Sequence, residues 1–239
     1  MSFEELLKIE FKEISVDLNE VQVKQFKQYY EMLIEANQKF NLTAITEMQE
    51  VIVKHFVDSC LLLEDVELKG SLIDVGTGAG FPGIPLKIIN RHLQVTLLDS
   101  LRKRIVFLED VCQKLGLNDV KCVHETADNS AKMALYRDNF DICVSRAVAK
   151  LPTLLEYCTP FLKVGGSFYA YKSIGVEEEL AQATKAMKIL NCKAGQVFNH
   201  KIVCGEEVQK RTIVEFKKTA LTPKAYPRPQ NKPRTHPLI

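Results

Sequence analysis

Residues 74–83 read Asp74-Val75-Gly76-Thr77-Gly78-Ala79-Gly80-Phe81-Pro82-Gly83, an acid followed by four glycines. The apolar run at 71–75 predicts a β-strand before the glycines, and residues 83–89 predict a helix after them. Glycine lets the backbone turn tightly and come close to a ligand, at an entropic cost that a simple linker would not need. The order of strand, glycine turn and helix therefore predicts a nucleotide-binding site in an α/β fold.

The acid in this stretch indicates which ligand the turn binds. Residues 78–83 match G-x-G-x-x-G, the fingerprint of dinucleotide sites, in which a pyrophosphate lies on the helix N-terminus. The Asp74 carboxylate would repel that anion, but it suits the ammonium group of S-adenosylmethionine. Asp74 with Gly76, Gly78 and Gly80 is the pattern of the first motif of Rossmann-like methyltransferases. A nicotinamide or flavin site and a glycine loop without any ligand are the alternatives.

A second acid lies at the spacing that a nucleoside site requires. Residues 94–99 predict a parallel strand that ends in Asp99, 25 positions after Asp74. A carboxylate at that strand end can accept both ribose hydroxyls. A strand-end acid is also a common helix cap, and Ser100 could serve as that cap equally well. Because the glycine motif precedes it, we favour Asp99 as the ribose ligand.

Strand-like runs alternate with helices along the middle of the chain. Five strands are predicted, at 71–75, 94–99, 120–124, 140–144 and 167–172, the last after a Gly165-Gly166 turn. Two later strands, near 201–204 and 211–216, are joined by an acidic turn too short for a crossover helix, so they pair antiparallel. After the third strand, the amide of Ala127 and the carboxylate of Asp128 could read an adenine edge.

The spacing of apolar residues before the glycine turn is helical. A helix is predicted over 18–40, behind an Asp17-x-x-Glu20 start that resembles a capping box, and a second one from about 47 to 63. The second helix carries His55 and Asp58. We therefore expect three parts: an N-terminal helical extension at 1–66, a Rossmann-like domain at 67–218, and a tail at 219–239.

Composition excludes several classes of protein. A chain of 239 residues with 46% hydrophobic content can bury a core in one or two domains. It has no signal-peptide pattern and no run near the ~18 apolar residues of a membrane span, so we expect a cytoplasmic protein. Its seven cysteines form no C-x-x-C pair, which indicates neither a disulfide framework nor a metal site.

The charge of the tail differs from that of the rest of the chain. Residues 217–239 hold six Lys or Arg, no acid and five prolines, while the whole chain carries only +2. A Pro-rich cationic segment cannot build its own core, so it could be a disordered, solubilising end. Alternatively it is an arm that contacts phosphates, because clustered cations release counterions when they meet nucleic acid.

Five stretches together carry a closer resemblance. They are 41–43 (Asn-Leu-Thr), 54–59 (Lys-His-Phe-Val-Asp-Ser), 74–86 with its Phe-Pro-Gly-Ile-Pro-Leu end, 98–100 (Leu-Asp-Ser) and 145–147 (Ser-Arg-Ala). In these the chain resembles the family of ribosomal small subunit methyltransferase G, also called GidB, over about residues 20 to 235. The resemblance implies a class I methyltransferase with a seven-stranded mixed sheet in strand order 3-2-1-4-5-7-6. It also implies methyl transfer from S-adenosylmethionine to N7 of one guanosine in 16S rRNA, in the loop beside the decoding site.

The resemblance also implies the residues of the site. Cofactor contacts fall on Gly76, Phe81, Ala127, Asp128 and Arg146, with Asp99 as the ribose acid. Guanine N7 carries a lone pair and no proton, so the reaction needs no general base, and Arg146 is expected to orient ligand or RNA. RNA contacts are expected from Lys172, Lys210, Arg211, Arg228 and Arg234. The roles of Asn41 and His55 stay open.

The expected partner is 16S rRNA or a small-subunit particle, bound by a monomer without a metal ion. A methyltransferase of another RNA or of a small molecule is the alternative enzyme. A non-enzymatic RNA-binding module is the alternative of a different class, and it leaves the cofactor motif without a purpose.

Overall fold

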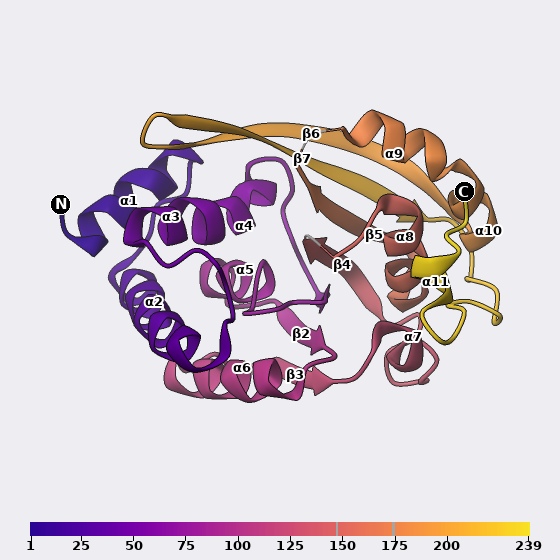
Figure 1. Ribbon diagram of the computed structural model, residues 1–239, viewed down its shortest axis with the longest axis horizontal. Coiled ribbons are helices and arrows are strands. Elements are labelled where there is room, and N and C mark those ends of the chain that lie inside the picture. The colour runs from indigo at the N-terminus through magenta and orange to yellow at the C-terminus, as the bar shows by residue number, and fades with distance from the viewer. Residues whose placement is uncertain (147, 174) are drawn as a thin grey trace.

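A seven-stranded sheet in the order β3-β2-β1-β4-β5-β7-β6 forms the centre of the molecule (Figure 1). The computed structural model describes residues 1–146, 148–173 and 175–239, so Ala147 of the Ser-Arg-Ala motif lies outside the described residues. The strands are β1 (Ser71–Val75), β2 (Gln94–Asp99), β3 (Val120–His124), β4 (Phe140–Arg146), β5 (Leu162–Lys172), β6 (Cys192–Cys204) and β7 (Glu207–Lys218). The predicted strand order is confirmed.

The direction of pairing fixes where a ligand can bind. Strands β1 to β5 pair parallel, and β7 runs antiparallel to both β5 and β6. In a parallel sheet the ligand crevice lies outside the carboxyl ends of the strands, where the strand order reverses. Here the chain order reverses between β1 and β4, so the carboxyl ends of β1, β2 and β4 mark the expected site.

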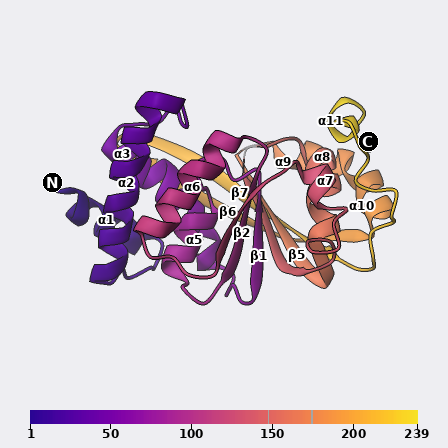
Figure 2. The same cartoon turned by 90° about the horizontal axis from the view of Figure 1, so that it is seen from below.

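Helices cover both faces of the sheet, as Figure 2 shows from its edge. Side chains alternate along β1, so that Leu72 packs with the helices on one face and Ile73 with those on the other. The helices are α1 (Phe3–Glu13), α2 (Glu20–Phe40), α3 (Met48–Val51), α4 (Asp58–Cys60), α5 (Gly83–Ile89), α6 (Arg102–Lys114), α7 (Ala127–Ser130), α8 (Leu151–Cys158), α9 (Val176–Gln182), α10 (Thr184–Leu190) and α11 (Lys232–Thr235). None within the described ranges is long and apolar enough to cross a membrane.

The start of α2 differs from the prediction. The capping box is formed by Asn19 and Gln22, not by the predicted pair Asp17 and Glu20. The Asn19 side chain accepts hydrogen bonds from the backbone of Val21 and Gln22, and the Gln22 side chain accepts one from the backbone of Asn19. Asn and Gln offer the same side-chain oxygens as the more familiar Ser and Glu, so the box forms two residues later than expected.

The helix predicted over 47–63 is helical but not regular. It contains α3, a π-helical segment η1 (Ile52–Val57), α4 and a 3₁₀ turn η2 (Leu61–Glu64). π-helical turns inside α-helices are frequent at functional sites, because the wider turn re-aims the side chains that it carries. His55 lies in this π-helical segment and Asp58 directly follows it.

The predicted turn at Gly165-Gly166 is wrong, because both glycines lie inside β5. The register of β5 against β4 shifts between Phe140 and Ile142, and Gly165 has a φ of 89°. A Cβ on Gly166 would lie 2.9 Å from the backbone oxygen of Asp141. These glycines therefore allow a bulge and a close approach between two strands rather than a chain reversal.

The C-terminal tail is docked on the domain, which argues against the first of the two alternatives for it, a disordered end. Arg137 donates to the backbone oxygens of Thr222 and Tyr226, and the Thr153 hydroxyl donates to the backbone oxygen of Pro233 at 2.8 Å. Leu238 is buried in the same core as α8 and α10. In Figure 1 the tail, in yellow, runs beside α8 and carries α11.

Candidate active site

The glycine turn after β1 adopts a conformation that only glycine accepts without strain. Gly76, Gly78 and Gly80 have φ values of 73°, 64° and 108°. A Cβ on Gly76 would meet the Val148 side chain at 2.7 Å, and one on Gly80 would meet the Tyr29 hydroxyl at 2.5 Å. Nothing lies within 4 Å of the corresponding position on Gly78, so the turn faces open space there.

Asp74 is buried beneath the turn, and its Oδ1 has no hydrogen-bond partner among the described residues, so the expected ammonium contact stays a prediction. Its side chain is fully buried, and Oδ2 accepts hydrogen bonds from the Thr77 hydroxyl at 2.7 Å and the Gly83 amide at 2.8 Å. Burial raises the pKa of Asp74 to about 6, against the opposing effect of these two hydrogen bonds. Asp74 therefore fastens the glycine turn to the start of α5.

Two adjoining cavities lie along the carboxyl ends of the strands. The first, of about 420 Å³, is lined by the glycine turn with Phe81, His55, Arg104 and Arg146, and the second, of about 620 Å³, by residues 125–129, Tyr157 and the tail. They share Gly76, Asp99, Ser100, Val148 and Arg234. Together we call them the edge groove. Its size is that of a cofactor or small-molecule site.

Asp99 is held rigidly between the two halves of the edge groove. Its Oδ1 accepts from the Leu101 amide at 2.9 Å, while Oδ2 accepts from the Gly78 amide at 2.9 Å and from Arg104 at 3.1 Å. The contact with Leu101 orders the turn before α6, whose N-cap residue Leu101 receives no side-chain cap hydrogen bond. The place of Asp99 in both cavities supports the ribose interpretation. A carboxylate oriented by three donors is a preorganised acceptor.

The far half of the edge groove is closed by a segment that the sequence did not reveal. Ala127 and Asp128 line it from the start of α7, next to Tyr157 of α8. The opposite wall comes from the tail, namely Pro229, Gln230, Asn231 and Arg234. Arg234 donates to the backbone oxygen of Val148 at 3.0 Å. This contact could not be predicted from local sequence patterns, because the tail lies against residues about a hundred positions earlier in the chain.

Arg146, at the end of β4, joins the glycine turn to the N-terminal helices. Its Nη1 donates to Asp58 Oδ2 at 2.7 Å and its Nη2 to His55 Nδ1 at 3.3 Å. Its guanidinium carbon lies 5.0 Å from the centre of the Phe81 ring, on which the His55 ring also stacks at 4.5 Å. The turn, the π-helical segment and β4 thus meet at one point, consistent with a cation–π contact.

His55 is neutral in this arrangement. Burial first, and then the charge of Arg146, lower the pKa of His55 to about 3. Because its Nδ1 accepts from Arg146, its proton is on Nε2, which donates to the Thr43 hydroxyl at 2.8 Å. The structure thus gives His55 and Thr43 a supporting role. Asn41 ends α2 in the left-handed conformation, with φ at 48°.

A third cavity, of about 500 Å³, lies beyond Arg146. We call it the basic cavity; its lining residues are Lys54, His55, Asp58, Leu61, Arg146, Tyr171, Lys172, Ser173, Gln209, Arg211 and Ile213. Asp58 binds two of its cations, Arg146 at 2.7 Å and Arg211 Nε at 2.6 Å. Lys172 pairs with Glu179 at 2.9 Å.

The five expected RNA contacts therefore lie in different surroundings. Lys172 and Arg211 line the basic cavity, Lys210 is exposed on β7, and Arg234 is exposed beside the edge groove. Arg228 differs, because it donates to the carboxylate of Glu156, a fully buried side chain. The structure thus gives Arg228 a part in docking the tail instead of a free charge for RNA.

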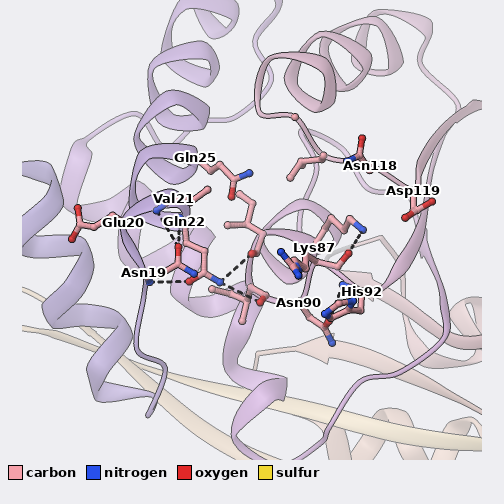
Figure 3. A pocket seen from close by; sticks show the side chains of 15 residues that line it. Asn19, Glu20, Val21, Gln22, Gln25, Lys87, Asn90, His92, Asn118 and Asp119 are labelled. Atoms are coloured by element: carbon pink, nitrogen blue, oxygen red, sulfur yellow. Dashed lines mark hydrogen bonds between the residues drawn. The ribbon is translucent and has the colours of Figure 1, made fainter.

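A cavity of about 960 Å³, larger than the three described above, lies at the opposite end of the sheet (Figure 3). It is lined by the start of α2, the end of α5 and the loop before β3, near the amino ends of the strands. Its polar groups serve the fold: Lys87 donates to the oxygens of Arg91 and Leu93, and Gln22 to those of Ile88 and Ile89. Parallel sheets bind ligands at the other end, so we place the active site at the edge groove.

Solved structures similar to this chain share its fold. A SAM dependent methyltransferase from Aquifex aeolicus superposes with a TM-score of 0.53 at 16% identity, over 74% of this chain and 97% of the other. A precorrin-6y C5,15-methyltransferase from Geobacter metallireducens superposes with a TM-score of 0.50 at 15% identity, over 75% and 91%. The architecture is thus that of class I S-adenosylmethionine-dependent methyltransferases.

Sequence relatives are much closer. A ribosomal RNA small subunit methyltransferase G from Lachnoclostridium phytofermentans is 46% identical over 230 residues, 95% of this chain and 94% of the relative. One from Alkaliphilus oremlandii is 42% identical over the full length of both chains. The sequence pattern of the GidB family, described as rRNA small subunit methyltransferase G, matches residues 22–210. The chain therefore belongs to the rRNA small subunit methyltransferase G (GidB) family.

Proposed function

We propose that this protein transfers a methyl group from S-adenosylmethionine to N7 of a guanosine in the decoding-region loop of 16S rRNA. The observation that carries the proposal is the junction at Arg146, where a nucleoside-sized groove meets a cation-lined cavity of base size. A methyltransferase of another RNA or of a small molecule would share the groove. Membership of the GidB family favours ribosomal RNA.

The described residues fit the cofactor. The glycine turn faces open space at Gly78, while at Gly76 and Gly80 the absence of a Cβ lets the turn pack against Val148 and Tyr29. Asp99 would accept the ribose hydroxyls, and Ala127 and Asp128 would contact the adenine. Phe81 and Arg146 would flank the reacting end. Asp74 would hold the turn in shape through its Oδ2. When bound, S-adenosylmethionine supplies an electrophilic methyl group on a positively charged sulfur.

The site is suited to a reaction without proton transfer. The N7 lone pair of guanine would attack the methyl carbon, and the carbon–sulfur bond would break with its electrons going to sulfur. No proton leaves the base, so a general base is unnecessary, in agreement with the low pKa of His55. The contribution of Arg146 is then orientation, and correct alignment of reactants is worth up to roughly 7 to 11 kcal/mol in favourable cases.

Recognition of the RNA would require an accessible base. The deep, narrow major groove of A-form RNA hides N7, so the target must lie in a loop or be flipped out. Lys172, Lys210, Arg211 and Arg234 would contact phosphates, as cations do in most RNA interfaces. An rRNA substrate, naked or in a small-subunit particle, implies action in the cytoplasm. We further propose that the protein acts as a monomer and without a metal ion.

The proposed parts of the chain divide this work. The N-terminal extension at 1–66 would support Arg146 through His55 and Asp58. The domain at 67–218 would bind the cofactor, and the tail at 219–239 would close the adenine end of the groove.

The test is direct. Small subunits from cells lacking the gene are incubated with the protein and isotope-labelled S-adenosylmethionine, and the labelled nucleotide is mapped by mass spectrometry of 16S rRNA fragments. We expect one labelled guanosine, in the decoding-region loop and methylated at N7. Label in another RNA, at another atom or at several guanosines would contradict the proposal.

A further inference from the structure

We infer that the basic cavity receives the target guanine, with the N1–H and N2 amino group of the base donating to the Asp58 carboxylate. The inference rests on the proposed function and adds the residue that selects guanine.

The position of the basic cavity suits a base that is methylated from the edge groove. The two spaces share Arg146 and His55 as lining residues, so a ligand in one lies against the wall of the other. The Watson–Crick edge of guanine lies at about a right angle to its N7 lone pair, so a guanine whose N7 faces the edge groove beside Arg146 can turn that edge into the adjoining basic cavity. Enzymes that act on flipped bases commonly read that edge with hydrogen bonds.

The lining of the basic cavity complements that edge. Guanine offers two adjacent donors, N1–H and the N2 amino group, which a carboxylate can accept together. Asp58 is only 4% exposed, and each of its oxygens has a single arginine donor, from Arg146 or Arg211. A carboxylate oxygen has two lone pairs, so one site remains on each. Adenine has an acceptor at N1 and a single donor group, the N6 amino group, on that edge, so it cannot offer Asp58 two adjacent donors.

The remaining lining residues suit a nucleotide. The lining cations are already paired: Arg146 and Arg211 with Asp58, Lys172 with Glu179, and Lys54 with Glu50 and Glu207. They therefore hold the polar wall of the cavity in place, and a nucleotide would bind through directed hydrogen bonds more than through excess positive charge. Leu61, Tyr171 and Ile213 supply apolar surface for the flat face of a base. Tyr171 is fixed, because its hydroxyl donates to the backbone oxygen of Ser59 at 2.9 Å.

A purely structural role for Asp58 is the competing explanation, because the same carboxylate also positions Arg146. The two roles differ in their dependence on the base. If Asp58 reads the base, the natural enzyme methylates a base without the N2 amino group more slowly than guanine. An Asp58 variant then methylates guanine and that second base at similar rates. If Asp58 only holds Arg146, its variant loses activity equally on both bases.

The first experiment therefore uses 16S rRNA fragments with guanosine or inosine at the target position, made by ligation. Inosine keeps N7, O6 and N1–H but lacks the N2 amino group. We expect single-turnover methylation of inosine to be at least about tenfold slower with the natural protein. With Asp58→Asn, we expect that ratio to fall towards one. Equal rates on both bases with the natural protein would overturn the inference, as would an unchanged ratio in Asp58→Asn.

A second experiment does not depend on the folding of an Asp58 variant. Ser173 is an exposed lining residue, so Ser173→Trp would obstruct the basic cavity from its surface. Val164→Trp places the same side chain on an exposed position outside all the cavities described above and is the matched control. We expect Ser173→Trp to slow methylation at least about 30-fold, with calorimetric affinity for S-adenosylhomocysteine within twofold of the control.

If Ser173→Trp methylates at the rate of the natural protein, no base enters the basic cavity. If its affinity for S-adenosylhomocysteine falls by the same factor as its methylation rate, the cavity belongs to the cofactor. Either result would overturn the inference while leaving the proposed function intact. Absence of methyl transfer to any ribosomal guanosine by the natural protein would instead overturn both.

Discussion

Arg228 binds both carboxylate oxygens of Glu156, with Nε 2.9 Å from Oε1 and Nη2 2.7 Å from Oε2. The backbone amide of Arg228 donates to Oε1 as well, at 2.8 Å, and Nη2 also donates to the backbone oxygen of His236. Glu156 lies in α8 and is fully buried. This pair fastens the tail to the domain just before the residues that wall the edge groove, so docking of the tail and binding in the groove should be coupled.

Arg228→Ala should therefore weaken both stability and cofactor binding. The substitution leaves the Glu156 carboxylate buried without its charged partner, a change that costs about 3–5 kcal/mol in comparable sites. Part of that cost should appear as undocking of the tail, with about tenfold weaker binding of S-adenosylhomocysteine. Urea unfolding and calorimetry measure the two effects. Lys224→Ala, at an exposed tail position, is the control, and equal affinity in the two variants would refute the coupling.

Arg146→Ala should abolish most activity while the fold survives. The variant loses the contacts with His55 and Phe81, but Asp58 keeps its second partner, Arg211. We expect single-turnover methylation to fall at least about 100-fold and circular dichroism to stay native. Arg146→Lys should recover little, because an ammonium group cannot make the two directed contacts of a guanidinium. An unchanged rate of single-turnover methylation in Arg146→Ala would show that Arg146 does not orient the reactants.

The sequence was sufficient for the parts of the fold that depend on local patterns. The glycine turn, the strands at 71–75, 94–99 and 120–124 and the helix at 83–89 were predicted with the bounds that the structure shows. These elements have local signals: apolar residues at the spacing of a strand or a helix, and glycines where the backbone turns tightly. The strand order came from family resemblance, since hydrogen bonding between distant strands leaves no local signal.

The rest depended on partners far apart in the chain. Asp58 meets Arg146 and Arg211, which are 88 and 153 positions away, and nothing in the local sequence indicates this arrangement. The same reason explains why the pairing of Arg228 was not predicted. Counting charges shows that the tail is basic, but it does not show that Lys218 and Arg228 are paired with Asp138 and Glu156. The burial of Asp74 was not predicted either, because it depends on how the turn folds back over the strand.

His55 should make the protein sensitive to acid. Its pKa of about 3 lies below the ordinary value of about 6.5, so the folded state binds fewer protons than the unfolded state. The stability that neutral His55 contributes is present above pH 6.5 and is lost as pH falls towards 3. Asp74 acts in the opposite sense, because its raised pKa favours the folded state as pH falls below about 6. The effect of His55 must therefore be measured as a difference between variants.

The natural protein and His55→Gln are unfolded in urea at pH 7 and pH 5. We expect the difference in their unfolding free energies to change by about 2 kcal/mol between these pH values, in the direction that disfavours the natural protein at pH 5. His92→Gln, at an exposed histidine, is the matched control. A pH-independent difference for His55→Gln would mean that His55 is not held neutral.

Salt dependence should identify the cations that meet RNA. Lys210 is exposed and has no charged partner within the described ranges, so it is the clearest candidate for a phosphate contact. Lys210→Ala should reduce the slope of log affinity against log salt concentration by about 1, because one phosphate contact is lost. Lys69→Ala, which removes an exposed lysine before β1, should leave the slope unchanged.

Deletion of 217–239 cannot serve this purpose, since it would remove Lys218, which is buried against Asp138. Equal slopes for Lys210→Ala and the natural protein would place the RNA path away from β7.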